Sequence, residues 1–154
     1  MTRAIQIEGG QVLIDGALEQ TSLTLADGAI SAIGAARVKD ALALDASGLL
    51  VLPAIIDVHS DAFERQIMPR PGVHFDIALA LQDTDRQLAA NGITTCYHGL
   101  TLSWEPGLRS LQSGHEFFAA LADTRAQLGC DHRVQIRWET FLLEAVEYMD
   151  GWCG

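Results

Sequence analysis

The chain has 154 residues, of which 49% are hydrophobic, and this supports a folded domain with a core rather than a largely disordered polypeptide. The 20 acidic and 10 basic residues give a formal net charge of −10, which repels nucleic-acid phosphates and anionic membranes, so neither is an expected partner. The amino-terminal residues lack the apolar segment of a signal peptide, and no run approaches the roughly 18 apolar residues that span a bilayer. We therefore expect a soluble, cytoplasmic protein.

The three cysteines, Cys96, Cys130 and Cys153, lie far apart in the sequence and form no C-x-x-C pair. This spacing favours neither a disulfide framework nor a zinc site built from thiolates. We expect reduced, mostly buried thiols.

Residues 4–52 alternate apolar and polar side chains with a period of two, as half-buried β-strands do. The alternation covers short runs at 5–7, 12–14, 23–25 and 30–33, and a further strand is expected near 43–44. Asp15-Gly16 and Asp27-Gly28 separate these runs, and such dipeptides supply the positive φ angles of tight hairpin turns. The segment predicts a small antiparallel sheet.

From residue 49 the pattern changes. Residues 49–58 are almost continuously apolar, which predicts a strand buried on both faces and a domain boundary near residue 52. A helix is predicted over 76–91, with Asp76 as its N-cap and Gly92 just past its end. In chain order there follow a strand over 93–98, a helix opened by the capping-box spacing of 113–116 and ending at Gly129, a strand over 133–138 and a helix over 139–149.

Strands that alternate with helices imply an α/β fold with a parallel sheet and right-handed crossovers, either an open sheet or a closed barrel. A closed barrel of eight strand-helix units takes about 250 residues. Roughly 100 residues follow residue 50, so three units fit either a small open α/β domain or a truncated TIM-like barrel. The predicted domains are residues 1–52 and residues 53–154.

His59 and Asp61 are the strongest candidate functional residues. They stand two residues apart at the carboxyl end of the apolar strand, so their side chains point to the same side and can reach one ion. Imidazole nitrogen with carboxylate oxygen suits zinc, manganese or iron. His-x-Asp is a weak pattern alone, because in a loop it more often forms a solvated turn, but α/β folds place their active sites at the carboxyl ends of strands.

The segment Val51–His59, with Leu44–Gly48 and Asp27–Gly34 before it, resembles the start of amidohydrolase-superfamily enzymes, and the resemblance covers residues 5–61. It implies an N-terminal β-sandwich part, followed by a TIM-like (β/α) barrel whose first strand ends in two metal ligands. Those ligands are His59 and Asp61 here. Most members have a second histidine in place of Asp61 and a glycine in place of Ala54.

His59-x-Asp61, together with Pro69-Arg70-Pro71, Gly92–Thr95 and Arg137–Glu139, is similar to one branch of that superfamily, the alpha-D-ribose 1-methylphosphonate 5-triphosphate diphosphatases. The resemblance runs over most of residues 49–139. It implies a metal-dependent hydrolase of phosphonate catabolism that converts a ribose 1-phosphonate 5-triphosphate to the 5-phosphate and releases pyrophosphate. It also implies one or two divalent ions, Zn²⁺ first, with Mn²⁺ or Fe²⁺ as alternatives.

Three further residues are assigned roles with the alternatives left open. The resemblance implies Glu139 as a third metal ligand, although a glutamate that opens a helix is also commonly a first-turn residue favoured by the helix dipole. Arg70 is a candidate ligand for a phosphate or phosphonate group, or a solvent-exposed loop residue. His98 is placed on the same rim as His59, where it could act in proton transfer, or be satisfied by a backbone carbonyl.

Two other functions compete with phosphorylated-sugar hydrolysis. One is hydrolysis of a C–N bond in a cyclic amide or amine, against which the aspartate at position 61 counts. The other is a non-catalytic truncated α/β fragment. A partial barrel exposes sheet edges and helix faces that should pair, so a homo-oligomer is expected, and these 154 residues alone are expected to have little or no activity.

Overall fold

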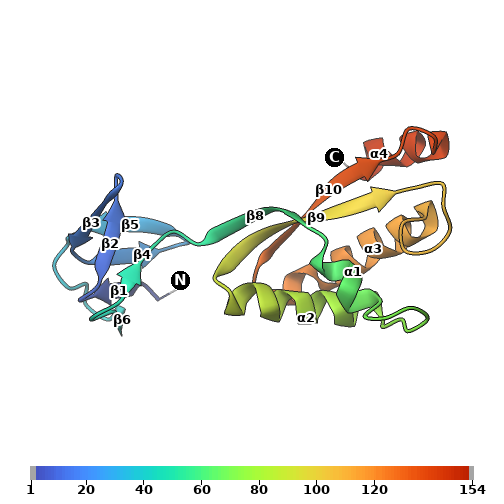
Figure 1. Ribbon diagram of the computed structural model, residues 1–154. Coiled ribbons are helices and arrows are strands. Elements are labelled where there is room, and N and C mark those ends of the chain that lie inside the picture. The colour runs from blue at the N-terminus through green and yellow to red at the C-terminus, as the bar shows by residue number, and fades with distance from the viewer. Residues whose placement is uncertain (1–2, 153–154) are drawn as a thin grey trace. The chain divides into compact units, whose positions relative to one another are not determined.

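A computed structural model describes residues 3–152 (Figure 1). The chain divides between Pro53 and Ala54 into two compact units. Cys153 lies outside the described residues, while Cys96 and Cys130 are free thiols. Among residues 3–152, no helix combines the length and the apolar character needed to cross a membrane.

The first unit consists of short strands in two sheets. The four-stranded sheet has the order β5-β4-β1-β6 and the three-stranded sheet the order β3-β2-β7. The strands are β1 (Ile5–Glu8), β2 (Gln11–Ile14), β3 (Ala17–Gln20), β4 (Leu23–Ala26), β5 (Ala29–Ile33), β6 (Leu42–Asp45) and β7 (Leu50–Val51). Asp15 and Gly16 have φ angles of 47° and 84°, which confirms the predicted tight turn between β2 and β3.

The prediction of a purely antiparallel sheet was wrong. β6 pairs in parallel with β1, and β7 pairs in parallel with β2. Each parallel partner returns after a long connection, as parallel pairing requires, so the alternating pattern located most of these strands but not their pairing.

The second unit has a parallel sheet of order β10-β9-β8, formed by β8 (Ile55–Ser60), β9 (Ile93–Leu102) and β10 (Asp131–Trp138). Helices α1 (Ala62–Ile67), α2 (Ile77–Ala90) and α3 (Leu111–Thr124) pack together on one face of it (Figure 1). The core between them includes Leu81, Leu100, Leu102 and Phe117, each at most 2% exposed. The other face of β10 carries exposed polar side chains, among them Gln135.

Three predictions for this unit need correction. The apolar segment 49–58 is two strands, because Pro53 lies between β7 and β8 and offers no N–H to a ladder. Ile55, Ile56 and Val58 are 56–68% exposed because β8 is an edge strand of the described sheet, so burial on both faces was also wrong. The predicted helix over 139–149 is a turn, then the 3₁₀ helix η2 (Leu143–Ala145) and α4 (Val146–Trp152).

The helix boundaries show which local signals hold. Asp76 caps α2, and its side chain accepts a hydrogen bond from the Leu79 amide at 3.0 Å, as predicted. Helix α3 begins earlier than predicted, because Ser110 rather than Ser113 is its N-cap and accepts from the Ser113 amide at 3.2 Å. It ends at Thr124, where the 3₁₀ helix η1 (Arg125–Gln127) follows.

Candidate metal centre

The turn from β8 into α1 positions His59 and Asp61. The register of β8 against β9 shifts between Asp57 and Ser60, which places buried Ser60 opposite His98. His59, one residue earlier, therefore points to the face away from the helices. The Asp57 carboxylate accepts a hydrogen bond from the His59 amide at 3.2 Å and so holds the backbone at this point.

His59 and Asp61 lie close enough to share one ion. The distance from His59 Nε2 to Asp61 Oδ1 is 3.8 Å, and the two side chains are 44% and 47% exposed. Two ligand bonds of about 2.1 Å each reach across a separation of up to about 4.2 Å. The pair can thus bind the same cation from an accessible position.

Gly99 on β9 lies beneath this pair. A Cβ atom there would stand 2.7 Å from His59 Cε1 and 2.8 Å from Asp61 Oδ1, which is closer than van der Waals contact allows. The absence of a side chain at position 99 therefore makes room for the arrangement of His59 and Asp61.

Gln135 on β10 completes the surroundings of the imidazole. Its Oε1 atom is hydrogen-bonded to His59 Nδ1. Because Gln135 is paired with Gly99 in the parallel register, its side chain passes over a position that carries none.

Arg109, in the loop after β9, forms a two-pronged contact with Glu64 of α1. Its Nε donates to Glu64 Oε1 at 3.0 Å and its Nη2 to Oε2 at 2.9 Å. The hydrogen bond and charge of Glu64 raise the pKa of Arg109 above its ordinary value, with smaller contributions from the charges of Asp61 and Glu139. Arg109 thus ties the loop to α1 and places a positive charge near both carboxylates.

Glu139 and Arg70, two other predicted site residues, do not join His59 and Asp61 in a metal-binding group. Within residues 3–152, no group of three or more His, Cys, Asp or Glu side chains could hold a metal ion. Glu139 is exposed just past β10, and its amide donates to the Leu102 carbonyl at 3.0 Å. Arg70 is exposed in a turn closed by the Val73 amide. Their roles stay predictions.

The predicted position of His98 needs correction. β9 continues to Leu102, so His98 is an interior strand residue, and it points to the helix-covered face, opposite to Gly99. It is fully buried, with its ring 5.2 Å from that of Phe63 and 5.7 Å from that of Phe117. His98 therefore does not share a rim with His59.

His98 belongs instead to a buried network of polar side chains, formed with Cys96, His132 and Asp85. Its Nε2 lies 2.8 Å from Nδ1 of His132, whose Nε2 lies 3.1 Å from the carboxylate of Asp85 on α2. Burial, and then the neighbouring His132, lower the pKa of His98 to about 3. At the other end of this network, Cys96 Sγ lies 3.9 Å from His98 Nδ1.

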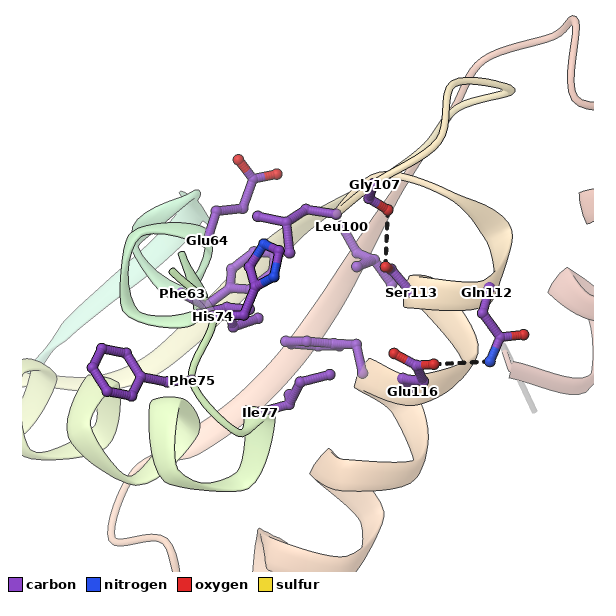
Figure 2. Close-up of a pocket in the computed structure, with 13 residues that line it drawn as sticks. Phe63, Glu64, His74, Phe75, Ile77, Leu100, Gly107, Gln112, Ser113 and Glu116 are labelled. Carbon is purple, nitrogen blue, oxygen red and sulfur yellow. Dashed lines mark hydrogen bonds between the residues drawn. The ribbon is translucent and has the colours of Figure 1, made fainter. Parts of the chain in front are cut away.

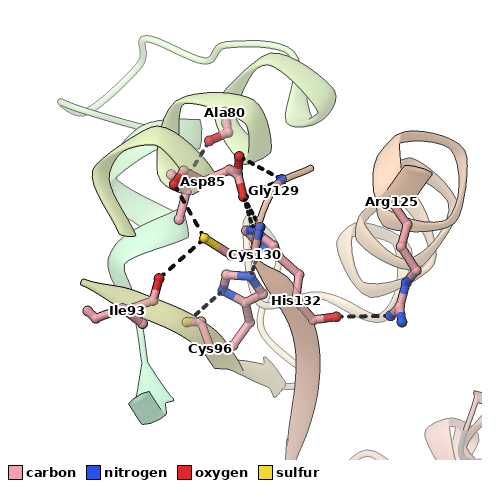
Figure 3. Close-up of polar contacts among 10 residues, drawn as sticks. Ala80, Asp85, Ile93, Cys96, Arg125, Gly129, Cys130 and His132 are labelled. Carbon is pink, nitrogen blue, oxygen red and sulfur yellow. Dashed lines mark hydrogen bonds and ion pairs between the residues drawn. The ribbon is translucent and has the colours of Figure 1, made fainter. Parts of the chain in front are cut away.

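Asp85 connects this polar network to the residues just before β10 (Figure 3). Its carboxylate accepts from the amides of Gly129 and Cys130 at 3.1 and 2.8 Å. Burial by itself would raise the pKa of Asp85, but these amides and His132 lower it below its usual value. Burial, and then Asp85, raise the pKa of the Cys130 thiol to about 11, so the thiol stays protonated.

A pocket of about 360 Å³ lies on the helix side, among α1, α3 and the start of α2 (Figure 2). Its lining is mixed. Phe63, Leu100 and Phe117 are among its apolar residues, and its polar side chains are Glu64, His74, Gln112, Ser113 and Glu116. Neither His59 nor Asp61 lines it. The pocket and the candidate metal centre are separate.

The chain resembles known proteins over most of its length, although no family model matches it. Alpha-D-ribose 1-methylphosphonate 5-triphosphate diphosphatase of Escherichia coli (strain K12) is 25% identical over 136 residues, which are 86% of this chain and 36% of that protein. Dihydropyrimidinase from Brevibacillus agri NCHU1002 has a TM-score of 0.60 at 20% identity, over 96% of this chain and 30% of that one. An amidohydrolase from a Sargasso Sea environmental sample has a TM-score of 0.58 at 18% identity, over 94% and 37%.

This chain is similar in sequence to the Escherichia coli diphosphatase and similar in fold to the amidohydrolase structures that it matches. It spans about a third of the length of the proteins it matches, and its small mixed sheets and helix-covered parallel sheet match in fold the N-terminal third of hydantoinase-like structures.

The site formed by His59 and Asp61 fits a divalent cation. One imidazole nitrogen and one carboxylate oxygen converge above a glycine, and both side chains are accessible. That donor set suits Zn²⁺, Mn²⁺ or Fe²⁺.

Two residues that adjoin this pair, Gly99 and Gln135, and the nearby Arg109 that binds Glu64 were not predicted. Gly99 had a usable signal, because a glycine inside a strand often marks a close approach of other atoms. Gln135 and Arg109 had none, since their partners are distant in the sequence.

Proposed function

We propose that this chain is the N-terminal part of a metal-dependent hydrolase. In this proposal β1–β7 contribute to a β-sandwich, and β8–β10 with their helices form the first three units of a TIM-like barrel. The similarity to the longer Escherichia coli protein and the matched third of the solved structures support it. The parallel order β8-β9-β10 is the order that successive barrel strands require.

His59 and Asp61 are proposed to bind the divalent ion, and the observation that carries this assignment is the 3.8 Å between Nε2 and Oδ1 above Gly99. Gly99 gives the two side chains room, and Asp57 holds the His59 backbone. Glu139 is proposed as a further carboxylate ligand. When bound, a divalent cation polarises a phosphoryl oxygen and offsets its negative charge.

The proposed substrate is a ribose 1-phosphonate 5-triphosphate, hydrolysed to the 5-phosphate with release of pyrophosphate. This follows from the similarity to the Escherichia coli diphosphatase, whose name gives that chemistry. Arg70 is proposed to bind a phosphate or phosphonate oxygen, because a guanidinium pairs with such groups through two parallel hydrogen bonds.

Metal binding by the chain tests the site. Zn²⁺ and Mn²⁺ are titrated calorimetrically into the wild type, His59→Ala and Asp61→Asn. His74→Ala and Asp123→Asn serve as controls, since both positions are exposed. We expect both site variants to lose binding and both controls to keep it. Equal binding in all five proteins would reject the assignment.

The substrate class is tested on a complete barrel. This chain is substituted for the matching segment of the Escherichia coli relative, and pyrophosphate release from the ribose 5-triphosphate is measured. A dihydropyrimidine serves as the competing substrate, because C–N hydrolysis is the alternative. Pyrophosphate release by the chimera that is lost in its His59→Ala variant supports the proposal. A folded, metal-binding chimera that opens only the dihydropyrimidine ring would support C–N hydrolysis instead.

A further inference from the structure

Gln135 is two strands away from His59 and yet contacts it. Neighbouring strands stand about 4.8 Å apart, so β8 and β10 are separated by roughly 9.6 Å. A side chain on the intervening position of β9 would block this approach, but that position is Gly99, the register partner of Gln135. The Gln135 amide therefore reaches His59 Nδ1 across a strand.

The atom that Gln135 presents determines which imidazole nitrogen holds the proton. Oε1 of an amide carries lone pairs and no hydrogen, so it can only accept a hydrogen bond. His59 Nδ1 must then carry a proton, and in the neutral ring, which has a single N–H, Nε2 keeps its lone pair. Nε2 is the atom that lies 3.8 Å from Asp61 Oδ1.

We propose that Gln135 is a positioning residue that holds neutral His59 in the tautomer with its proton on Nδ1, so that the Nε2 lone pair is preset to bind a cation with Asp61. Its use in metal binding rests on the proposed function, whereas the tautomer itself does not. Histidine ligands of metals commonly donate their other N–H to such an acceptor, which fixes the ring orientation.

Nitrogen NMR of the metal-free, ¹⁵N-histidine-labelled chain at pH 8 tests the tautomer directly. We expect His59 to show a protonated Nδ1 and an unprotonated Nε2. Gln135→Glu should keep this pattern, because a carboxylate can also only accept. Gln135→Asn, one methylene shorter, and Gln135→Leu should lose it, because no acceptor then reaches Nδ1.

Arg137→Leu is the matched control, since Arg137 is exposed on the same strand two residues further along. This variant should leave the His59 pattern unchanged. A wild-type His59 with its proton on Nε2 would overturn the proposal without any variant. So would a His59 pattern that Gln135→Asn and Gln135→Leu leave unaltered.

Zn²⁺ titration of the same proteins separates this proposal from the proposed function. We expect Gln135→Leu and Gln135→Asn to bind Zn²⁺ about 10–100-fold more weakly than the wild type. Gln135→Glu should not show this loss of affinity. The expected tautomer in a wild type that binds no metal would uphold the role of Gln135 and reject the metal site. Unaltered Zn²⁺ affinity in all Gln135 variants would reject the positioning role.

Discussion

Gly99 leaves no room for a side chain beneath the candidate centre. His59 Cε1 and Asp61 Oδ1 both lie within 2.8 Å of where its Cβ would be, and Gln135 reaches across the same position. Binding geometries tolerate displacements of only about 0.5 Å. A single added methyl group therefore requires His59 and Asp61 to shift from this arrangement.

We expect Gly99→Ala to weaken Zn²⁺ binding by about 10-fold or more while the circular dichroism spectrum stays that of the wild type. Gly151→Ala is the control, because among residues 3–152 no atom outside its own helix backbone and its chain neighbours lies within 4 Å of the added Cβ. Calorimetric titration measures both. Unchanged affinity in Gly99→Ala would show that the ligands do not depend on this packing.

The buried position of His98 predicts that the folded chain loses stability in mild acid. Burial and the neighbouring His132 hold the pKa of His98 near 3 in the folded chain, against 6.5 ordinarily. Between these values the unfolded chain binds a proton that the folded chain does not. The free energy of unfolding therefore receives this contribution in full above pH 6.5 and falls, by up to roughly 1 kcal/mol per pH unit, as the pH drops toward 3.

Urea unfolding of the wild type and His98→Gln at pH 7 and pH 5 measures this contribution. We expect the variant to lose less stability between the two pH values, because the introduced amide side chain does not titrate. This range stays above the titration of Asp85, whose pKa is lowered from 3.8. His74→Gln should lose as much as the wild type, and an equally steep loss in His98→Gln would contradict the prediction.

Among the secondary-structure elements, strand β9 separates the helix-covered core from the candidate metal centre, because its successive residues face opposite sides of the sheet. Cys96, His98, Leu100 and Leu102 are buried on the helix-covered side, while Gly99 faces His59. The helices on the buried side begin at the side-chain caps Asp76 and Ser110. Each cap satisfies an amide that the helix itself leaves unpaired.

Asp76→Ala and Ser110→Ala should each lower the free energy of unfolding by about 1 kcal/mol, measured by urea denaturation. Asp123→Ala, at an exposed position near the end of α3, should change it by less than about 0.5 kcal/mol. A Ser110→Ala variant as stable as the wild type would show that the Ser110 side chain does not cap α3.

At the scale of the whole molecule, the two units have separate buried residues. The larger hydrophobic core runs from Phe63 to Ala145 and lies within the second unit. The first unit buries a smaller set that includes Gln6, Val12 and Leu23. A core substitution should therefore act within its own unit.

Phe117 is 1% exposed, and its ring lies 4.7 Å from that of Phe63. We expect Phe117→Ala to destabilise the second unit by about 3–5 kcal/mol, because the change leaves a cavity. Hydrogen exchange should quicken in α2, α3 and β9 but not in β1 and β4. Phe141→Ala, at an 85% exposed side chain, should have little effect, and equal quickening in β1 would contradict separate units.

The sequence by itself determined the features that depend on neighbours a few residues apart. The Asp15-Gly16 and Asp27-Gly28 turns, the Asp76 cap and the proximity of His59 to Asp61 are all local. The alternation of strands and helices also predicted the parallel sheet of the second unit. In each of the local cases the deciding contact closes within about four residues, so the local pattern contains it.

Only the tertiary structure decided which strands pair and which side chains meet across them. Gln135 contacts His59 from 76 residues away, and Arg109 binds Glu64 from 45 residues away. His98 belongs to the buried face because β9 continues to Leu102 and its register against β8 shifts. Register is set jointly by strands far apart in the chain, and a shift of one residue moves a side chain to the other face.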